Sequence, residues 1–149
     1  MKLSQNFSLS EFTASDTAAR KGIDNTLPDS LIPTAQATAQ MLERIRAELG
    51  SLPITVTSGY RCQALNAAIG SSSTSDHTKA MAVDFKCPAY GSPYEVARNL
   101  APLLDMLGIG ALIHEYGQWV HVSTRIPDKI INRVITISSD GTQPGVQRA

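Results

Sequence analysis

Residues 111–124, which read ALIHEYGQWVHVST, decide the fold. Two strand-like runs, Ala111 to Tyr116 and Trp119 to Thr124, make up this segment, and Gly117 stands between them. Two such runs separated by a short glycine-containing turn are typical of a β-hairpin. We therefore predict two adjacent antiparallel strands in the second half of the chain.

Two further strands are expected upstream and one downstream. Residues 54–57 are β-branched throughout, which favours a strand. In residues 81–86, apolar side chains alternate with less apolar ones, so Asp84 is expected on the less apolar face of a second strand. Residues 133–138 are expected to add a strand at the edge of the sheet.

The remaining regular elements are helices. The longest is expected at Ser30 to Leu49, where apolar residues recur at spacings of three and four and Gly50 marks the end. Shorter helices are expected at Glu11 to Ala14, Cys62 to Ile69 and Pro93 to Leu107. Since helices and strands are mixed and the hairpin is local, we predict an α+β fold, with a mainly antiparallel sheet of about four strands and helices packed on one side.

Composition limits the class of protein. The 149 residues, of which 42% are hydrophobic, are enough for one globular domain. We assign this domain to residues 1–139 and expect a loose tail at residues 140–149. The 13 basic and 13 acidic residues cancel, which argues against a nucleic-acid partner. No apolar stretch is long enough for membrane insertion, and residues 1–6 lack the apolar run of a signal peptide.

Cys62 and Cys87 are the only cysteines. Two cysteines do not make a disulfide-based scaffold, although a single bridge stays open if their segments adjoin. We favour two free thiols in a chain made in a reducing cytoplasm.

His77, Asp84 and His121 form a candidate metal-binding set. His77 and Asp84 belong to the segment SDHTKAMAVD at residues 75–84, and His121 alternates with valines in WVHVS at residues 119–123. Zinc binds imidazole nitrogen and carboxylate oxygen, and three protein ligands leave one position open for catalysis. By spacing alone, three unrelated surface residues explain the pattern as well as a zinc site does.

The surrounding motifs carry a family resemblance. Ser58-Gly59-Tyr60-Arg61, Leu65-Asn66 and the two segments just quoted follow one another in an order that resembles the zinc D-alanyl-D-alanine carboxypeptidase family. That family includes phage endolysins and vancomycin-resistance dipeptidases and has the hedgehog/DD-peptidase fold. The resemblance runs from Phe7 to Ser123. It implies that His77, Asp84 and His121 are the ligands of one zinc ion.

The ligand segment departs from the family at one position. Ala80 stands where the family normally has glycine. Alanine adds a methyl group and loses easy access to positive φ. If the backbone needs a positive φ there, the loop is strained, but the ligands themselves are intact.

The general base depends on the register of the hairpin. A two-residue turn places His114 opposite His121, whereas a three-residue loop pairs Glu115 with Trp119 and puts Glu115 on the face of His121. The residues alone do not choose between them. The resemblance favours Glu115, because hedgehog-like domains and many phage relatives carry the acid six residues before the last histidine. Other relatives carry it three residues before, where this chain has Gln118, which cannot accept a proton.

Further site residues follow from the resemblance. It places Arg61 in the active site, where a guanidinium binds a substrate carboxylate or stabilises an oxyanion. Ser75 is expected to orient the loop of His77 or to contact substrate. Tyr60 and Trp119 are expected to contact substrate in the cleft, with core or rim packing as the alternative.

The resemblance implies a zinc metallopeptidase that cleaves the peptide stems of bacterial peptidoglycan, as a D,D-carboxypeptidase or an endopeptidase. A phage endolysin or virion lysin fits the chain best. We expect a monomer without a signal peptide, made in the cytoplasm of the host bacterium and acting on the cell wall after release. The alternative is a non-catalytic, zinc-containing binding or virion structural module of the same fold.

Overall fold

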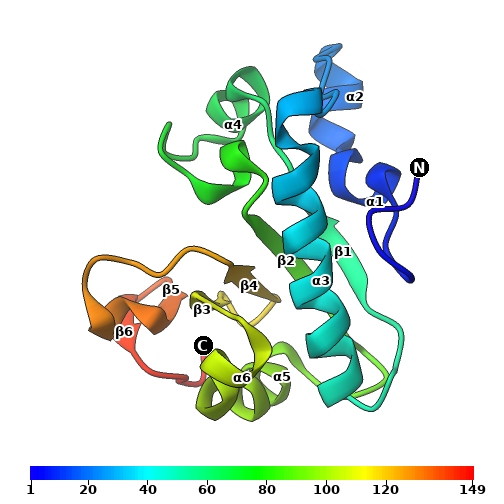
Figure 1. Cartoon of the computed structure of the whole chain (residues 1–149). Coiled ribbons are helices and arrows are strands. Elements are labelled where there is room, and N and C mark those ends of the chain that lie inside the picture. The colour runs from blue at the N-terminus through cyan, green and yellow to red at the C-terminus, as the bar shows by residue number, and fades with distance from the viewer.

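A six-stranded mixed sheet with the order β1-β2-β4-β3-β5-β6 lies at the centre of the computed structural model, which describes all residues from 1 to 149 (Figure 1). The strands are β1 (Thr55–Ser58), β2 (Ala82–Lys86), β3 (Ala111–Glu115), β4 (Trp119–Ser123), β5 (Val134–Ser138) and β6 (Gly141–Pro144). All neighbouring strands pair antiparallel except β3 and β5, which are parallel. The α+β class is confirmed, but the prediction of about four mainly antiparallel strands is wrong, because the sheet is mixed and has six.

The C-terminal part of the chain accounts for the parallel strand pair and for the sixth strand of the sheet. The connection between β4 and β5 spans residues 124–133 and lets β5 pair parallel to β3. The chain then turns at Gly141, whose φ is 101°, and returns as β6 along β5. Residues 140–149, expected as a loose tail, therefore contain a strand, and β5 is not the edge strand. The sequence of β6, GTQP, is exposed and lacks the apolar alternation that marks a strand.

The chain has six α-helices. They are α1 (Leu9–Thr13), α2 (Asp16–Lys21), α3 (Ile32–Glu48), α4 (Gln63–Ile69), α5 (Pro93–Leu100) and α6 (Leu104–Leu107). The helix predicted at Pro93 to Leu107 is divided by the 3-10 turn η3 (Ala101–Leu103), because Pro102 cannot donate the backbone hydrogen bond of a continuous helix. The short helix α2 was not predicted.

The core lies on one face of the sheet. Apolar side chains of α3 and α5 share one buried cluster with Val83, Phe85, Leu112, Val120 and Val122 of β2, β3 and β4. Figure 1 shows α3 running from top to bottom of the view in front of the sheet, beside β1 and β2. Since side chains alternate along a strand, residues next to these core positions point to the opposite face, which carries the candidate site.

Both ends of the chain are fastened to the body. Near the N-terminus, Glu43 of α3 accepts hydrogen bonds from the Ser4 hydroxyl at 2.6 Å and from the Asn6 backbone and side-chain nitrogens, both at 2.7 Å. Near the C-terminus, the Gln147 carbonyl lies 2.9 Å from Nδ1 of the buried His114, and the Gln147 N–H donates to the Thr136 hydroxyl.

The structure bears on two expectations, one about a disulfide between the cysteines and one about membrane-spanning segments. Cys62 and Cys87 are free thiols rather than a disulfide. None of the helices combines the length and the apolar character that crossing a membrane requires.

Candidate metal centre

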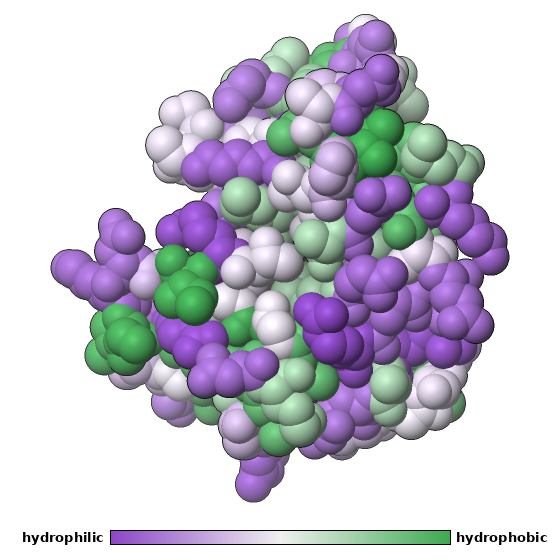
Figure 2. Space-filling model, in the orientation of Figure 1, coloured by the Kyte–Doolittle hydropathy of each residue, from purple (hydrophilic) through white to green (hydrophobic).

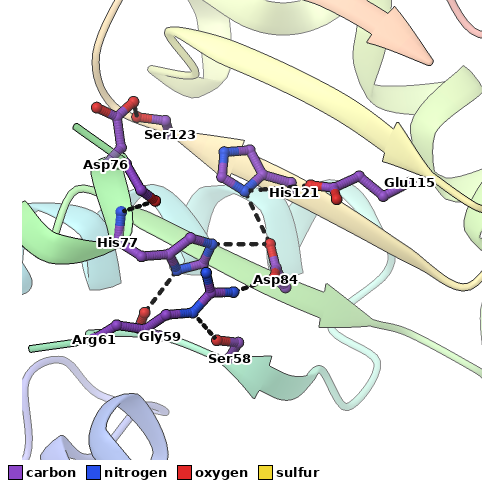
Figure 3. Close-up of polar contacts among 10 residues, drawn as sticks. Ser58, Gly59, Arg61, Asp76, His77, Asp84, Glu115, His121 and Ser123 are labelled. Atoms are coloured by element: carbon purple, nitrogen blue, oxygen red, sulfur yellow. Dashed lines mark hydrogen bonds and ion pairs between the residues drawn. The ribbon is translucent and has the colours of Figure 1, made fainter. Parts of the chain in front are cut away.

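His77, Asp84 and His121 come together from three elements (Figure 3). Their ligand atoms all lie within 4.8 Å of one another. Asp84 Oδ1 lies 3.3 Å from His77 Nε2 and 2.9 Å from His121 Nδ1. Two ligands each about 2.1 Å from one zinc ion lie about 3.4 Å apart in a tetrahedral site. The set therefore fits a zinc ion after small adjustments of its side chains.

Strand register brings two of these residues together. Asp84 in β2 lies directly opposite His121 in β4. Their neighbours along the strands, Val83, Phe85 and Val120 among them, are fully buried in the core. The alternation that buries the valines thus turns Asp84 and His121 toward the opposite face.

The third residue, His77, is held in one orientation. It lies in the 3-10 turn η2 (Asp76–Lys79), and its Nδ1 lies 2.7 Å from the Gly59 carbonyl. A protonated Nδ1 donates to this carbonyl and leaves the Nε2 lone pair facing Asp84. Histidines that bind metals are commonly oriented by such a hydrogen bond from the other ring nitrogen. Gly59 is required for this approach, since a Cβ there would lie 2.4 Å from the Phe12 carbonyl oxygen.

Ser75 supports the same turn. Its hydroxyl accepts a hydrogen bond from the His77 backbone N–H at 3.3 Å and so caps η2. Ser75 also lines the cleft over the metal centre. The structure thus places Ser75 where both expected roles, orienting the loop and contacting substrate, are possible.

Ala80 ends the turn in the left-handed conformation, with φ at 58° and ψ at 23°. Its carbonyl accepts a hydrogen bond from the Thr38 hydroxyl at 2.7 Å, and its methyl group is fully buried. The condition named for strain, a positive φ at this position, is therefore met. The same conformation directs the chain from η2 into β2, which carries Asp84.

Asp76 is a structural contributor that the sequence analysis did not single out. It is 8% exposed, and its carboxylate accepts hydrogen bonds from Ser123 Oγ at 2.8 Å and Arg125 Nε at 2.7 Å. These bonds tie the His77 turn to the end of β4, which carries His121. A signal existed, since Ser123 shares the strand face of His121 and Asp76 adjoins His77.

The hairpin adopts the three-residue loop. Glu115 pairs with Trp119, which puts Glu115 on the same face as His121, and Glu115 Oε1 lies 3.8 Å from His121 Nδ1. The turn has positive φ at Tyr116 (54°) and Gly117 (68°), and the Gln118 N–H closes it on the Glu115 carbonyl. Such a pair of conformations suits the twist of a tight hairpin.

His114 occupies the opposite face. It is 1% exposed, and its ring lies 5.9 Å from the ring of Tyr94. With Nδ1 at the Gln147 carbonyl, His114 belongs to the packing of the chain end. The alternative that placed His114 beside the metal is therefore wrong, because the hairpin has the other register.

Arg61 lies beside Asp84 (Figure 3). One Nη donates to Asp84 Oδ2 at 3.4 Å, and Nε donates to Ser58 Oγ at 3.1 Å. A bulge between Val56 and Ser58 shifts the register of β1, so that Ser58 instead of Thr57 lies opposite Asp84. The bulge thus positions the hydroxyl that holds Arg61.

The two aromatic candidates, Trp119 and Tyr60, lie in different surroundings. Trp119 lines the cleft over the metal centre. Tyr60 does not, because its side chain is 7% exposed and packs in the core cluster, and its backbone N–H donates to the Phe12 carbonyl. The expectation that Tyr60 contacts substrate is therefore replaced by its alternative, core packing.

The charges of the site suit a cation. Burial alone would raise the pKa of Asp84, but hydrogen bonds from His121 and His77 and the charges of both outweigh it and lower that pKa below its usual range. For Glu115, burial and then the negative charge of Asp84 raise the pKa, and His121, Trp119 and Arg61 offset only part of this. Asp84 is thus anionic, and Glu115 is a stronger proton acceptor than an exposed glutamate.

A cleft of about 350 Å³ opens above these residues. Its walls consist of Arg61, Ile69, Gly70, Ser71, Ser75, His77, Asp84, Glu115, Tyr116, Trp119 and His121. A mostly polar cleft over two imidazoles, one carboxylate and a free glutamate can hold a metal and admit a polar substrate to it.

Comparisons with known proteins agree with this chemistry. No curated protein matches the chain. The model of one family, described as Peptidase M15, matches residues 5–123, which include every residue of the metal centre and its cleft. This family contains the zinc D-alanyl-D-alanine carboxypeptidase-like enzymes. The chain therefore belongs to the M15 family of peptidases.

Proposed function

We propose that the protein is a zinc peptidase that hydrolyses the peptide stems of bacterial peptidoglycan. One observation carries the proposal: three ligand atoms of His77, Asp84 and His121 lie within 4.8 Å of one another, with Glu115 beside them in an open cleft. Three ligands are the number found in catalytic zinc sites, whereas structural sites use four. Membership of a peptidase family supports the same chemistry.

Each residue has a role in this proposal. His77, Asp84 and His121 would hold a zinc ion, which would supply Lewis-acid chemistry toward the scissile carbonyl and the attacking water. Glu115 accepts the proton of the water and passes it to the leaving amine. Arg61 donates hydrogen bonds to the carbonyl oxygen or to a substrate carboxylate, and Trp119 and Ser75 contact the neighbouring residues of the peptide.

The substrate class and the biological setting extend this proposal. The motifs around the site resemble those of peptidoglycan peptidases, and family membership supports a substrate of that type. We assign the protein a lytic role like that of a phage endolysin or virion lysin, acting on the bacterial wall as a monomer.

Release of peptides from purified peptidoglycan tests the function. The zinc-loaded protein is expected to release stem fragments, which mass spectrometry identifies. A chelator is expected to abolish release, and added zinc to restore it. Stoichiometric zinc without any release would instead indicate a non-catalytic binding module of the same fold.

A further inference from the structure

We propose that this peptidase is an endopeptidase, which cuts a bond inside a peptide and binds substrate residues on both sides of the metal centre. This inference rests on the function proposed above and names the kind of peptide that the same site takes. A carboxypeptidase holds the free carboxylate that ends its substrate. Its cleft therefore closes one residue beyond the scissile bond, at a cation that faces the carboxylate.

The cleft instead continues in two directions. Past Arg61, a second hollow of about 400 Å³ shares Arg61 and Trp119 with the central cleft and reaches residues 14–17, where α1 passes into α2. Past His121, a third hollow of about 510 Å³ extends over the sheet to β5 and β6. We call these hollows the Arg61 arm and the His121 arm. The metal centre lies where they meet, so a peptide can extend from it both ways.

Neither arm closes at a free cation. Arg61 is the only cationic side chain in its arm, and it lies where that arm joins the centre, bound to Asp84 and Ser58. In this proposal Arg61 therefore donates to the oxygen of the scissile carbonyl and not to a terminal carboxylate. Arg125 is the only cationic side chain in the other arm, and its Nε donates to Asp76 at 2.7 Å. The arms thus offer room for further residues of a chain and lack a cation reserved for its end.

Both arms combine polar and apolar groups. The Arg61 arm has the polar residues Ser15, Asp16, Thr17, Thr57 and Ser58 beside Ala14, Ile69 and Trp119. The His121 arm has Ala111, Ile113, Ile135 and Pro127 beside polar residues such as Ser72, Thr74, Asn132 and Thr142. The segment after Pro127 carries the exposed Ile130 and Ile131, and hydrophobic side chains stand out at the left of Figure 2 over this segment. Each arm thus offers both polar and apolar groups to the residues of a bound peptide.

The reaction is ordinary hydrolysis. One water adds to the carbonyl carbon of an internal peptide bond, and the C–N bond breaks. The OH of the water stays on the new carboxylate, and its other proton goes to the new amine by way of Glu115. No oxidant, reductant or co-reactant beyond water is needed.

A pair of synthetic stem peptides tests the proposal. Both have one sequence and an acetylated N-terminus, but one ends in a free carboxylate and the other in an amide. The zinc-loaded protein is expected to cut both at the same internal bond, with kcat/KM values within about threefold of each other. A carboxypeptidase would lose a charged contact and prefer the free acid by at least about tenfold. That preference, or release of the terminal residue alone, would overturn the inference.

Two variants test the arms separately. Thr17→Trp narrows the Arg61 arm and Thr142→Trp narrows the His121 arm, because both residues line these hollows away from the metal centre. Each variant is expected to raise KM for the amidated peptide by at least about fivefold while zinc content stays unchanged. Ala89→Trp, at an exposed position outside both arms, is the matched control. An effect of only one variant would overturn the inference that substrate residues bind on both sides of the metal centre.

These experiments separate the inference from the function on which it rests. Cleavage restricted to the free-acid peptide overturns the endopeptidase assignment and leaves a peptidase. If the zinc-loaded protein cuts neither peptide and releases nothing from peptidoglycan, the proposed function fails and the inference with it.

Discussion

At the scale of single residues, the position of Glu115 determines what the site can do. It shares the face of His121 only because the hairpin loop has three residues. We predict that Glu115→Gln lowers the peptidase rate by about 10²- to 10⁴-fold, the usual contribution of a general base. Zinc content is expected to stay at one ion per chain, as measured by atomic emission. Gln118→Ala, in the same loop, is the control, and full activity of Glu115→Gln would refute the assignment.

Replacing Ala80 by glycine has opposing effects on the free energy of unfolding. Glycine at this position would relieve a positive φ that costs an L-residue about 1–2 kcal/mol. It would also remove a buried methyl group, worth about 0.8 kcal/mol, and make the unfolded chain more flexible at a cost of about 0.5–1 kcal/mol. Ala80→Gly is therefore expected to leave the free energy of unfolding within about 1 kcal/mol of the unchanged protein.

The contrasting variant is Ala80→Val. A branched side chain overfills a fully buried position and keeps the positive φ, so we expect a loss of about 2–5 kcal/mol. Urea unfolding measures both variants. A gain above about 2 kcal/mol for Ala80→Gly would mean that strain dominates at this turn.

At the scale of elements, Glu43 joins α3 to the N-terminal segment. Burial raises its pKa, but the hydrogen bonds from Asn6 and Ser4 outweigh this, so the pKa is lowered in the folded protein. A lowered pKa stabilises the fold fully above the unfolded value of about 4.3, and this contribution is lost as pH falls through the lower folded value. Glu43→Gln is expected to lose about 1–3 kcal/mol at pH 7.

The pH dependence of unfolding distinguishes this contact from general packing. The difference in stability between the unchanged protein and Glu43→Gln should shrink as the pH is lowered through the acidic range. Glu48→Gln, on the same helix, makes none of these contacts and serves as the control. A difference that stays constant down to the lowest pH would contradict the role given to the carboxylate.

At the scale of the whole molecule, the C-terminal segment supports the hairpin that carries Glu115. The Gln147 backbone forms hydrogen bonds with His114 and Thr136. The Arg148 guanidinium lies 4.4 Å from the centre of the Tyr94 ring. Removing residues 145–149 leaves His114 buried without this partner, so we expect a loss of about 2–5 kcal/mol in unfolding free energy. Gln147→Ala keeps the backbone bonds and should cost less than about 1 kcal/mol. An unchanged stability of the truncated chain would show that the segment is not a support.

Sequence reasoning predicted those elements that carry a side-chain pattern. The alternation around Asp84 and His121 and the periodic apolar face of α3 each mark an element that the structure contains. It missed β6, which is held by backbone pairing with β5 and has no apolar side to reveal it. The parallel pairing of β3 and β5 likewise depends on how a ten-residue connection runs through space.

The candidate site, too, could be predicted from the sequence only in part. The three proposed ligands were selected from their motifs, and the structure brings them together. The sequence could not decide the hairpin register, because one residue more or less in the loop exchanges His114 and Glu115 between faces. Nor could it reveal that Asp76 binds Arg125, since that contact joins residues 49 positions apart.

The pairing of Asp84 with His121 also affects when the protein can acquire its metal. Bacterial and other ribosomes add about 5–20 residues per second, so His121 is made about 2–9 s after His77. During that interval the nascent chain offers only two of the three ligands, and the strand that aligns Asp84 is still missing. Tight binding must therefore await the closure of β4 on β2, which couples metal uptake to a late folding step. The metal centre is thus complete only once β4 has joined the sheet.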